Sequence, residues 1–324
     1  MVSRSLVDHE RGISIVIPAH DEAQVLARSL RAVLDQDFDG CVDVVVVANG
    51  CRDDTAAVAR SFIGEKGEPR RSLRVYELDI AGKAAALNKG DAEKRFACTM
   101  YLDADVVLSP RAVAAVYREL HAAGAPYASP QLRIAPSDSP VTRAYGRVWS
   151  RVPYVQKRVR GVGCFAVSAD GRARWDEYPN LLADDRFVRL HFEAEEQGVV
   201  EEAAYIWPLP EGLRELVRVR ARWLLGNREL RRKRPDLAER DDRRYEGLAL
   251  FVVRNPGSWA DVAVFMAVYA LAFLRMWVKQ SKGDLTWDRA VRSRVRAASP
   301  TCGSNAEPSN AEPSNAEPMT SRSG

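Results

Sequence analysis

Short apolar runs alternate with amphipathic stretches along the first third of the chain, and polar residues close each run. The runs are rich in valine, isoleucine and leucine, which is typical of strands buried on both faces. The stretches between them carry apolar residues at helical spacing, as in 26–34 and 111–121. This alternation predicts an α/β fold with a mostly parallel, Rossmann-like sheet flanked by helices. The predicted strands lie at 13–17, 42–48, 73–78 and 99–108.

Polar loops follow the predicted strands, and their position in the fold matters more than their separation in sequence. In a parallel sheet, loops at the carboxyl ends of strands share one edge, where ligands bind. We therefore expect the loops to converge on one crevice. They lie at 18–22, 49–55, 82–90 and 103–105.

Two carboxylates one residue apart, Asp103 and Asp105, mark the end of the fourth run. Carboxylate oxygens are ligands that hard cations prefer, so the pair can hold Mg²⁺ or Mn²⁺. Such an ion would also meet the diphosphate of a nucleotide. Aspartate is common in solvated turns as well, so the motif alone leaves both interpretations open.

The alternation of strand-like and helix-like stretches becomes less regular after residue 125, where prolines divide the chain into short pieces. Gly161 and Gly163 precede an apolar run and indicate either a close backbone approach to a ligand or tight strand packing. Asp184 and Asp185 stand at a predicted helix start, where acidic residues serve either as helix caps or as catalytic groups.

A basic helix is predicted at 213–234, and an apolar helix follows at 259–278. The uncharged core of the second helix, 262–274, covers about 20 Å at about 1.5 Å per residue, against about 30 Å for a hydrocarbon core. Three arrangements fit: a short span, an interfacial helix, or a buried helix of a soluble protein. The basic stretch favours the membrane, with that stretch on the cytoplasmic side, so we expect attachment to the inner face of the cytoplasmic membrane.

Composition removes several classes of function. The chain has 324 residues, is 46% hydrophobic and carries a net charge of +4, which allows a large core and gives no broadly basic surface. Its five cysteines are scattered, so neither a disulfide framework nor a zinc site is indicated. Nucleic-acid binding is poorly supported because the basic run lacks interleaved aromatic residues beyond Trp223. No P-loop motif occurs, and the Ser-Asn-Ala-Glu-Pro repeats at 304–318 predict a disordered tail.

Taken together, the loops resemble those of family 2 glycosyltransferases, which are inverting enzymes of the GT-A fold. Residues 17–22 look like the first nucleotide loop of that family, and 49–55 resemble the second. Residues 82–90 are similar to its Gly-Lys-x-x-Ala-Leu-Asn-x-Gly segment, Asp103-Ala104-Asp105 matches its DxD motif, and 183–185 look like its catalytic-base pair. The resemblance covers about residues 13–230 and follows the order of the family's motifs.

The resemblance implies transfer of one sugar from a nucleotide-diphospho-sugar to a hydroxyl acceptor, which a lipid could carry. Asp185 would be the general base and Asp184 would orient or cap it. Asp105 and Asp103 would hold Mg²⁺ or Mn²⁺. No obligate protein partner and no nucleic acid are implied. The residues expected to bind the nucleotide sugar are Pro18, Ala19, Glu22, Asn49, Asp53, Lys83, Asp103, Arg222 and Trp223.

The chain departs from the family pattern in two places. Ala48 and Asn49 stand where many members have two aspartates, so the family pattern does not predict which nucleobase the donor carries. Arg222-Trp223 resembles the end of the processive Gln-x-x-Arg-Trp motif, but Val219 occupies the glutamine position. With one candidate membrane segment as well, a polymer-extruding synthase is disfavoured. A sugar-1-phosphate nucleotidyltransferase and an inactive, membrane-associated nucleotide-sugar-binding protein stay as alternatives.

These implications divide the chain into five expected segments. An N-terminal extension precedes a nucleotide-sugar-binding half and an acceptor half of one GT-A domain. A helical, membrane-associated segment and the repeat tail follow. The expected ranges are 1–12, 13–125, 126–235, 236–298 and 299–324.

Overall fold

The computed structural model describes residues 11–64, 70–151, 159, 161–240 and 256–281. The predicted extension and repeat tail therefore lie almost wholly outside the described residues. The strands are β1 (Gly12–Ala19), β2 (Cys41–Asn49), β3 (Arg71–Leu78), β4 (Thr99–Leu102), β5 (Val107–Leu108), β6 (Tyr127–Ile134), β7 (Cys164–Val167) and β8 (Gln197–Trp207). The α-helices are α1 (Leu26–Leu34), α2 (Thr55–Arg60), α3 (Lys83–Glu93), α4 (Ala112–His121), α5 (Pro140–Trp149), α7 (Ala169–Arg172), α8 (Asp184–Arg189), α9 (Gly212–Lys233), α10 (Pro235–Glu239) and α12 (Trp259–Ser281).

All eight strands join one sheet in the order β3-β2-β1-β4-β7-β6-β8-β5. β3, β2, β1 and β4 pair in parallel, and so do β6 and β8. The strand β7 runs antiparallel to both of its neighbours, and β5 runs antiparallel to β8. The predicted α/β fold with a mostly parallel sheet is therefore confirmed. The sheet continues across residue 125, and the division predicted there stays a prediction.

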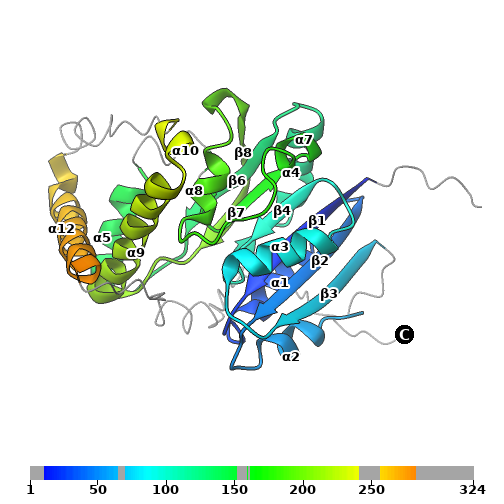
Figure 1. Cartoon of the computed structure of the whole chain (residues 1–324), viewed down its shortest axis with the longest axis horizontal. Helices are drawn as coiled ribbons and strands as arrows, with labels where there is room; N and C mark the ends of the chain where they lie inside the picture. Colours follow the sequence, from blue (N-terminus) through cyan, green and yellow to red (C-terminus); the bar gives the residue numbers. More distant parts are fainter. Residues whose placement is uncertain (1–10, 65–69, 152–158, 160, 241–255, 282–324) are drawn as a thin grey trace, which may run out of the picture.

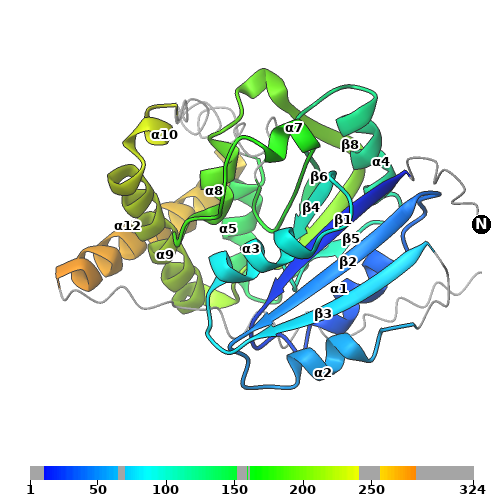
Figure 2. The ribbon, with the colours of Figure 1, turned by 45° about the vertical axis from the view of Figure 1, so that its right-hand side comes forward.

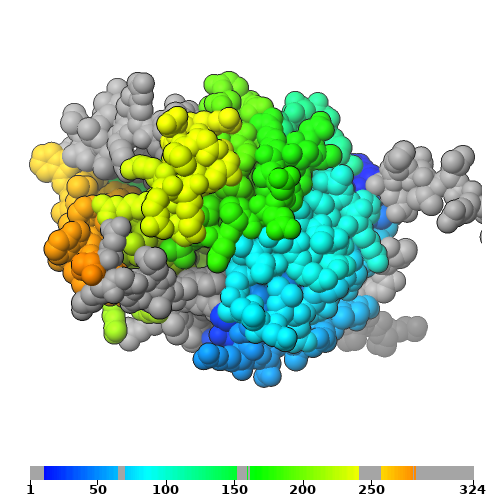
Figure 3. Space-filling view, in the orientation of Figure 1, coloured from blue at the N-terminus to red at the C-terminus, as the bar shows by residue number. Residues whose placement is uncertain are grey.

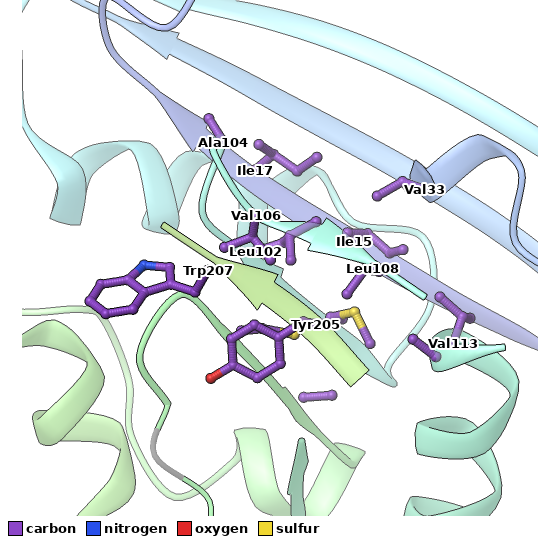
Figure 4. Packing of buried hydrophobic residues seen from close by; sticks show 14 of the residues in the cluster. Ile15, Ile17, Val33, Leu102, Ala104, Val106, Leu108, Val113, Tyr205 and Trp207 are labelled. Atoms are coloured by element: carbon purple, nitrogen blue, oxygen red, sulfur yellow. The ribbon is translucent and has the colours of Figure 1, made fainter. Parts of the chain in front are cut away.

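Helices cover both faces of the sheet, as Figures 1 and 2 show. The side chains of Ile13, Ile15 and Ile17 pack with α1 and α4 on one face, whereas Val16 packs with Leu87 of α3 on the other. β1 is buried along its whole length, which explains its continuous apolar sequence. The first core continues beneath β5 and β8, where Tyr205 and other labelled side chains lie together (Figure 4).

The middle of the chain contains more regular structure than its sequence predicts. β6 and β8 are long strands, and they pair in parallel with a register shift between Pro130 and Gln131. The proline and the shift interrupt the polar–apolar alternation that marks a strand. In β8 the exposed pair Glu201-Glu202 breaks the pattern in the same way. The prediction of short pieces was therefore wrong for this region.

The apolar helix α12 packs along one side against α9 and α5. Its buried side chains recur at helical spacing and include Phe265, Val268 and Ala272, and Asp261 accepts two hydrogen bonds from Arg147 at 2.7 and 2.6 Å. Among the described residues, Trp259–Lys279 is the one helix long and apolar enough to cross a membrane, and 22% of an apolar 18-residue window within it is buried. Its other face is apolar and exposed, and α12 forms the left-hand end of the molecule in Figure 3.

Candidate active site

Loops at the carboxyl ends of β1, β2 and β4 converge with the starts of α3 and α8, as the sequence predicts. They enclose two adjoining cavities of about 320 Å³ and about 180 Å³. The two cavities share part of their lining, including Lys83, Asp103, Asp184 and Arg222. The site therefore has two compartments that meet at charged side chains.

The larger cavity contains most of the residues predicted to bind a nucleotide sugar. Its lining includes Pro18, Glu22, Asn49 and Asp105 beside the shared charged residues. His20 also lines it, although no motif in the sequence singles out that residue, and its Nδ1 contacts the carbonyl oxygen of Asn49. This compartment joins the first two loops to the Asp-x-Asp turn.

The side-chain amide of Asn49 fastens three segments together. Its Nδ2 donates to the carbonyl of Ala19 at 2.7 Å, and its Oδ1 accepts from the backbone N–H of Gly82 at 2.9 Å. The residue is 2% exposed. An aspartate could not donate to Ala19, so asparagine at this position suits the loop geometry. Asn49 therefore shapes the cavity wall and has its amide already engaged there.

Two of the predicted binding residues do not line either cavity. Ala19 is buried behind the wall. The carboxylate of Asp53 accepts hydrogen bonds from the backbone N–H groups of Thr55 at 3.0 Å and Ala23 at 3.1 Å. Asp53 thus holds the start of α2 against the first loop.

Lys83 connects the two compartments electrostatically. Its Nζ lies 2.9 Å from Asp103 Oδ1 and 3.0 Å from Asp184 Oδ2. Burial acts to lower the pKa of Lys83, but the two carboxylates outweigh burial, and the pKa lies above the ordinary lysine value. The ammonium group therefore stays charged and holds the Asp-x-Asp turn and the start of α8 together.

Asp185 lines the smaller cavity and does not line the larger one. Burial raises the pKa of Asp185, and the charge of Asp184 raises it further. Lys83 and the backbone N–H of Arg186, which lies 2.7 Å from Asp185 Oδ1, act in the opposite direction. A carboxylate with a raised pKa accepts a proton more readily, which is what a general base requires.

The segment before β7 approaches the Asp-x-Asp turn closely. The carbonyl of Gly163 accepts a 2.8 Å hydrogen bond from the N–H of Asp103. Gly163 has φ +75°, and a Cβ there would lie 2.9 Å from Trp207 Cδ1. Gly161 has φ +69°, and a Cβ there would lie 2.7 Å from the hydroxyl of Tyr127. Both glycines therefore serve tight packing around the site.

Three tryptophans from separate elements form a wall of the smaller cavity. Trp149, Trp207 and Trp223 lie with ring centroids 5.6 to 6.2 Å apart. The structure thus places Trp223, which was expected to bind the donor, in the second compartment, whereas Arg222 lines both. Trp207 could not be selected from the sequence because the strand that carries it was not recognised.

The donor set around Asp103 and Asp105 fits a divalent cation. Both carboxylates line the larger cavity, and Asp184 adds a third acid near Lys83. Oxygen donors of this kind suit Mg²⁺ or Mn²⁺. His20, Asp21 and Cys51 also bring possible ligand atoms within 4.8 Å of one another, but Asp21 already accepts the N–H of Arg52 at 2.7 Å and His20 contacts Asn49.

Comparison with known proteins bears on the family and the fold. Residues 14–166 match the model of "Glycosyl transferase family 2". The fold is similar to that of the mannosyltransferase PcManGT from Pyrobaculum calidifontis, solved with GDP-Man and Mn²⁺, with a TM-score of 0.53 and 19% identity over 90% of this chain and 86% of that chain.

A second similar structure is S. aureus TarS 1-349 in complex with UDP, with a TM-score of 0.48 and 14% identity over 86% of this chain and 93% of that one. Against the longer TarS structure, the match spans 40% of that chain. Among curated proteins, none matches this sequence. The predicted resemblance to the family and the GT-A fold are confirmed.

Proposed function

From the membership of residues 14–166 in glycosyl transferase family 2, we propose that the chain is a metal-dependent, inverting hexosyltransferase. It moves one sugar from a nucleotide-diphospho-sugar to the hydroxyl of a glycan, a lipid-linked saccharide or a metabolite. The observation that carries the proposal is the meeting of the two cavities at Lys83, Asp103 and Asp184. A donor in one cavity and an acceptor in the other would have their reacting groups side by side.

Asp185 is the proposed general base. An alcohol is a poor nucleophile, and a carboxylate that removes its proton as the new bond forms accelerates the reaction about 10²- to 10⁴-fold. The acceptor oxygen attacks the anomeric carbon, and the bond to the diphosphate breaks on the opposite side, which inverts the anomeric centre. The raised pKa of Asp185 and its place in the smaller cavity support this role, and Asp184 keeps the base in position.

On the donor side, Pro18, Glu22 and the wall shaped by Asn49 are proposed to surround the nucleoside. Asp105 and Asp103 would hold Mg²⁺ or Mn²⁺, which when bound supplies positive charge to the leaving diphosphate. Lys83 adds a fixed positive charge at the boundary of the cavities and stabilises negative charge that develops there.

The exposed face of α12 is the proposed membrane contact. Phe273 is 53% exposed and Trp277 is 60% exposed, whereas Ala272 and Met276 pack against the domain. A helix that is attached along one side is not free to be surrounded by lipid, so an arrangement in the plane of the interface fits best. The basic residues of α9 would then face an anionic leaflet.

The test is release of nucleoside diphosphate by the purified full-length chain from a panel of uridine and guanosine diphospho-sugars with Mn²⁺. Turnover with one donor, together with a product of inverted anomeric configuration by NMR, is expected. If the folded protein binds the nucleotide sugar but transfers nothing to any acceptor or to water, the inactive binding protein is the correct description. Formation of a nucleotide sugar from a sugar phosphate would establish the nucleotidyltransferase.

A further inference from the structure

Arg220 of α9 is a buried guanidinium with no acidic partner among the described residues. It is 8% exposed, and its Nε is buried without a hydrogen bond. Its contacts are with aromatic faces: the guanidinium carbon lies 5.1 Å from the ring centre of Trp223 and 4.0 Å from that of Tyr269. The residues one helical turn away, including Leu216 and Leu224, are apolar, so the helix itself offers no counter-charge.

This arrangement differs from that of other basic residues on the same helix. Arg218 lies 3.2 Å from Glu215, and Lys233 lies 2.8 Å from Glu229. Burying a charge removes its hydration, and proteins normally compensate with an opposite charge and hydrogen bonds. Stacking on two rings compensates for only part of that loss. The buried position of Arg220 therefore suits a site that an anion completes.

The cavity beside Arg220 is the smaller compartment of the active site. Arg220 lines it together with the tryptophan wall, and Asp185 lines the same cavity. Arg186 and Arg189, which are also buried, contribute to the lining. The compartment thus combines the proposed base with aromatic faces suited to a sugar ring and with an arginine-rich region suited to an oxyanion.

We propose that Arg220 binds a phosphate-type anionic group on the acceptor, while the hydroxyl to be glycosylated faces Asp185. This inference rests on the proposed function, because it identifies the chemical class of the acceptor. Guanidinium groups bind phosphate oxygens through paired N–H donors. The phosphate could belong to a soluble phosphorylated sugar or to a lipid headgroup, and Tyr269 of α12, the helix proposed to contact the membrane, also lines this cavity.

The first experiment measures binding of inorganic phosphate to the full chain by its effect on the heat-unfolding midpoint, with and without a saturating nucleoside diphosphate and Mn²⁺. We compare wild type with Arg220→Met, which keeps the stem but removes the charge, and with Arg220→Lys. Arg228→Met is the matched control, because Arg228 also stacks on an aromatic residue of α12, Phe273, at 5.7 Å but does not line the cavity.

We expect Arg220→Met to raise the phosphate dissociation constant about 10- to 100-fold, the range for losing hydrogen bonds to a charged group. Arg220→Lys should restore part of the affinity, and Arg228→Met should change it less than about 2-fold. Equal phosphate binding by wild type and Arg220→Met would overturn the inference. If Arg220→Met does not fold, the fallback measurement is the tryptophan fluorescence of the wild type on addition of phosphate. The inference requires that phosphate changes this emission and that Trp223→Phe reduces the change. Wild-type emission that phosphate leaves unchanged overturns the inference.

The second experiment separates the sources of the phosphate and the two proposals. Nucleoside diphosphate release is compared between glycerol and glycerol 3-phosphate, and between phosphatidylcholine vesicles with and without phosphatidylinositol, whose headgroup carries both a phosphate and free hydroxyl groups. Stimulation by glycerol 3-phosphate indicates a soluble acceptor, and stimulation by phosphatidylinositol indicates a lipid. Arg220-dependent phosphate binding without any donor turnover would refute the transferase and keep the anion site. If the chain turns over the donor but its phosphate binding is unchanged by substitution of Arg220, the anion site is refuted and the transferase is kept.

Discussion

Substitution of Lys83 by methionine tests the electrostatic connection between the two compartments. The change keeps the length of the side chain and removes the ammonium that lies 2.9 Å from Asp103 and 3.0 Å from Asp184. Two carboxylates then face each other without the positive charge between them. We expect the variant to be less stable and to lose transfer activity, because the Asp-x-Asp turn and α8 are no longer held together.

The size of the stability loss follows from the exposure of the three side chains. Removing one partner of a fully buried ion pair costs about 3–5 kcal/mol, whereas an exposed pair contributes about 0–1 kcal/mol. Lys83, Asp103 and Asp184 are 29%, 32% and 14% exposed, so an intermediate loss of about 2 kcal/mol is expected. For a domain of this size that corresponds to a decrease in Tm of about 4–8 °C.

Urea and heat unfolding measure this loss, and Lys89→Met on the same helix is the control. Lys89 forms a single i,i+4 ion pair with Glu93 within α3, so its removal should cost much less than the removal of Lys83. Because the pKa of Lys83 is raised, its stabilisation is complete below the unfolded-state pKa of lysine and is lost only as pH rises through the folded-state value. The difference between Lys83→Met and wild type should therefore be constant from about pH 6 to pH 9.

A double-mutant cycle supplies the result that would refute this reasoning. Adding Asp184→Asn to Lys83→Met removes one of the two uncompensated carboxylates and should recover about half of the lost stability. If Lys83→Met is as stable as wild type, or if Asp184→Asn destabilises it further, the ammonium does not hold the two compartments together.

Three further predictions concern the base, the metal and the membrane. Asp185→Asn should keep nucleotide-sugar binding and reduce transfer about 10²- to 10⁴-fold, and retained turnover in the variant would exclude this base. Because burial raises the pKa of Asp185, transfer by the wild type should increase with pH through a midpoint above the ordinary pKa of aspartate. Asp105→Asn should lose the Mn²⁺-dependent part of nucleoside diphosphate binding in calorimetry, and an unchanged metal dependence would place the ion elsewhere. Phe273→Ser with Trp277→Ser should abolish co-sedimentation with anionic vesicles without lowering Tm, since both side chains are exposed; vesicle binding equal to wild type would exclude this face.

The sequence predicted the first half of the fold well because that half follows regular periodicities. β1 was expected at 13–17 and extends over Gly12–Ala19, and β2 was expected at 42–48 and extends over Cys41–Asn49. The convergence of the loops followed from parallel topology alone. β8 was missed because a strand that shifts register against β6 and exposes two adjacent glutamates shows neither simple alternation nor a continuous apolar run.

Site residues were predictable where a short sequence motif determines their position. They were not predictable where tertiary packing brings them into the site. The larger cavity contains Asp103 and Asp105 as expected, because both belong to one short turn. Asn49 was expected to contact a nucleoside, and in the fold its amide already forms hydrogen bonds to two other segments, at Ala19 and Gly82, which lie far from it in the sequence. The signal for Arg220 was present in the spacing of Leu216, Arg220 and Trp223, which places an arginine on the buried side of a basic helix.

The two proposals on membrane contact and acceptor chemistry meet on α12. Tyr269 lines the smaller cavity and stacks on Arg220, and Phe273, one turn further along, is exposed on the apolar face. If this face lies in the interface, the acceptor compartment is within one helical turn of lipid. A phosphate carried by a lipid would then reach Arg220 without leaving the membrane surface, whereas a soluble acceptor would gain nothing from the exposed face. Loss of the Phe273 and Trp277 side chains should therefore reduce transfer to a vesicle-borne acceptor and leave transfer to a soluble phosphate ester unchanged.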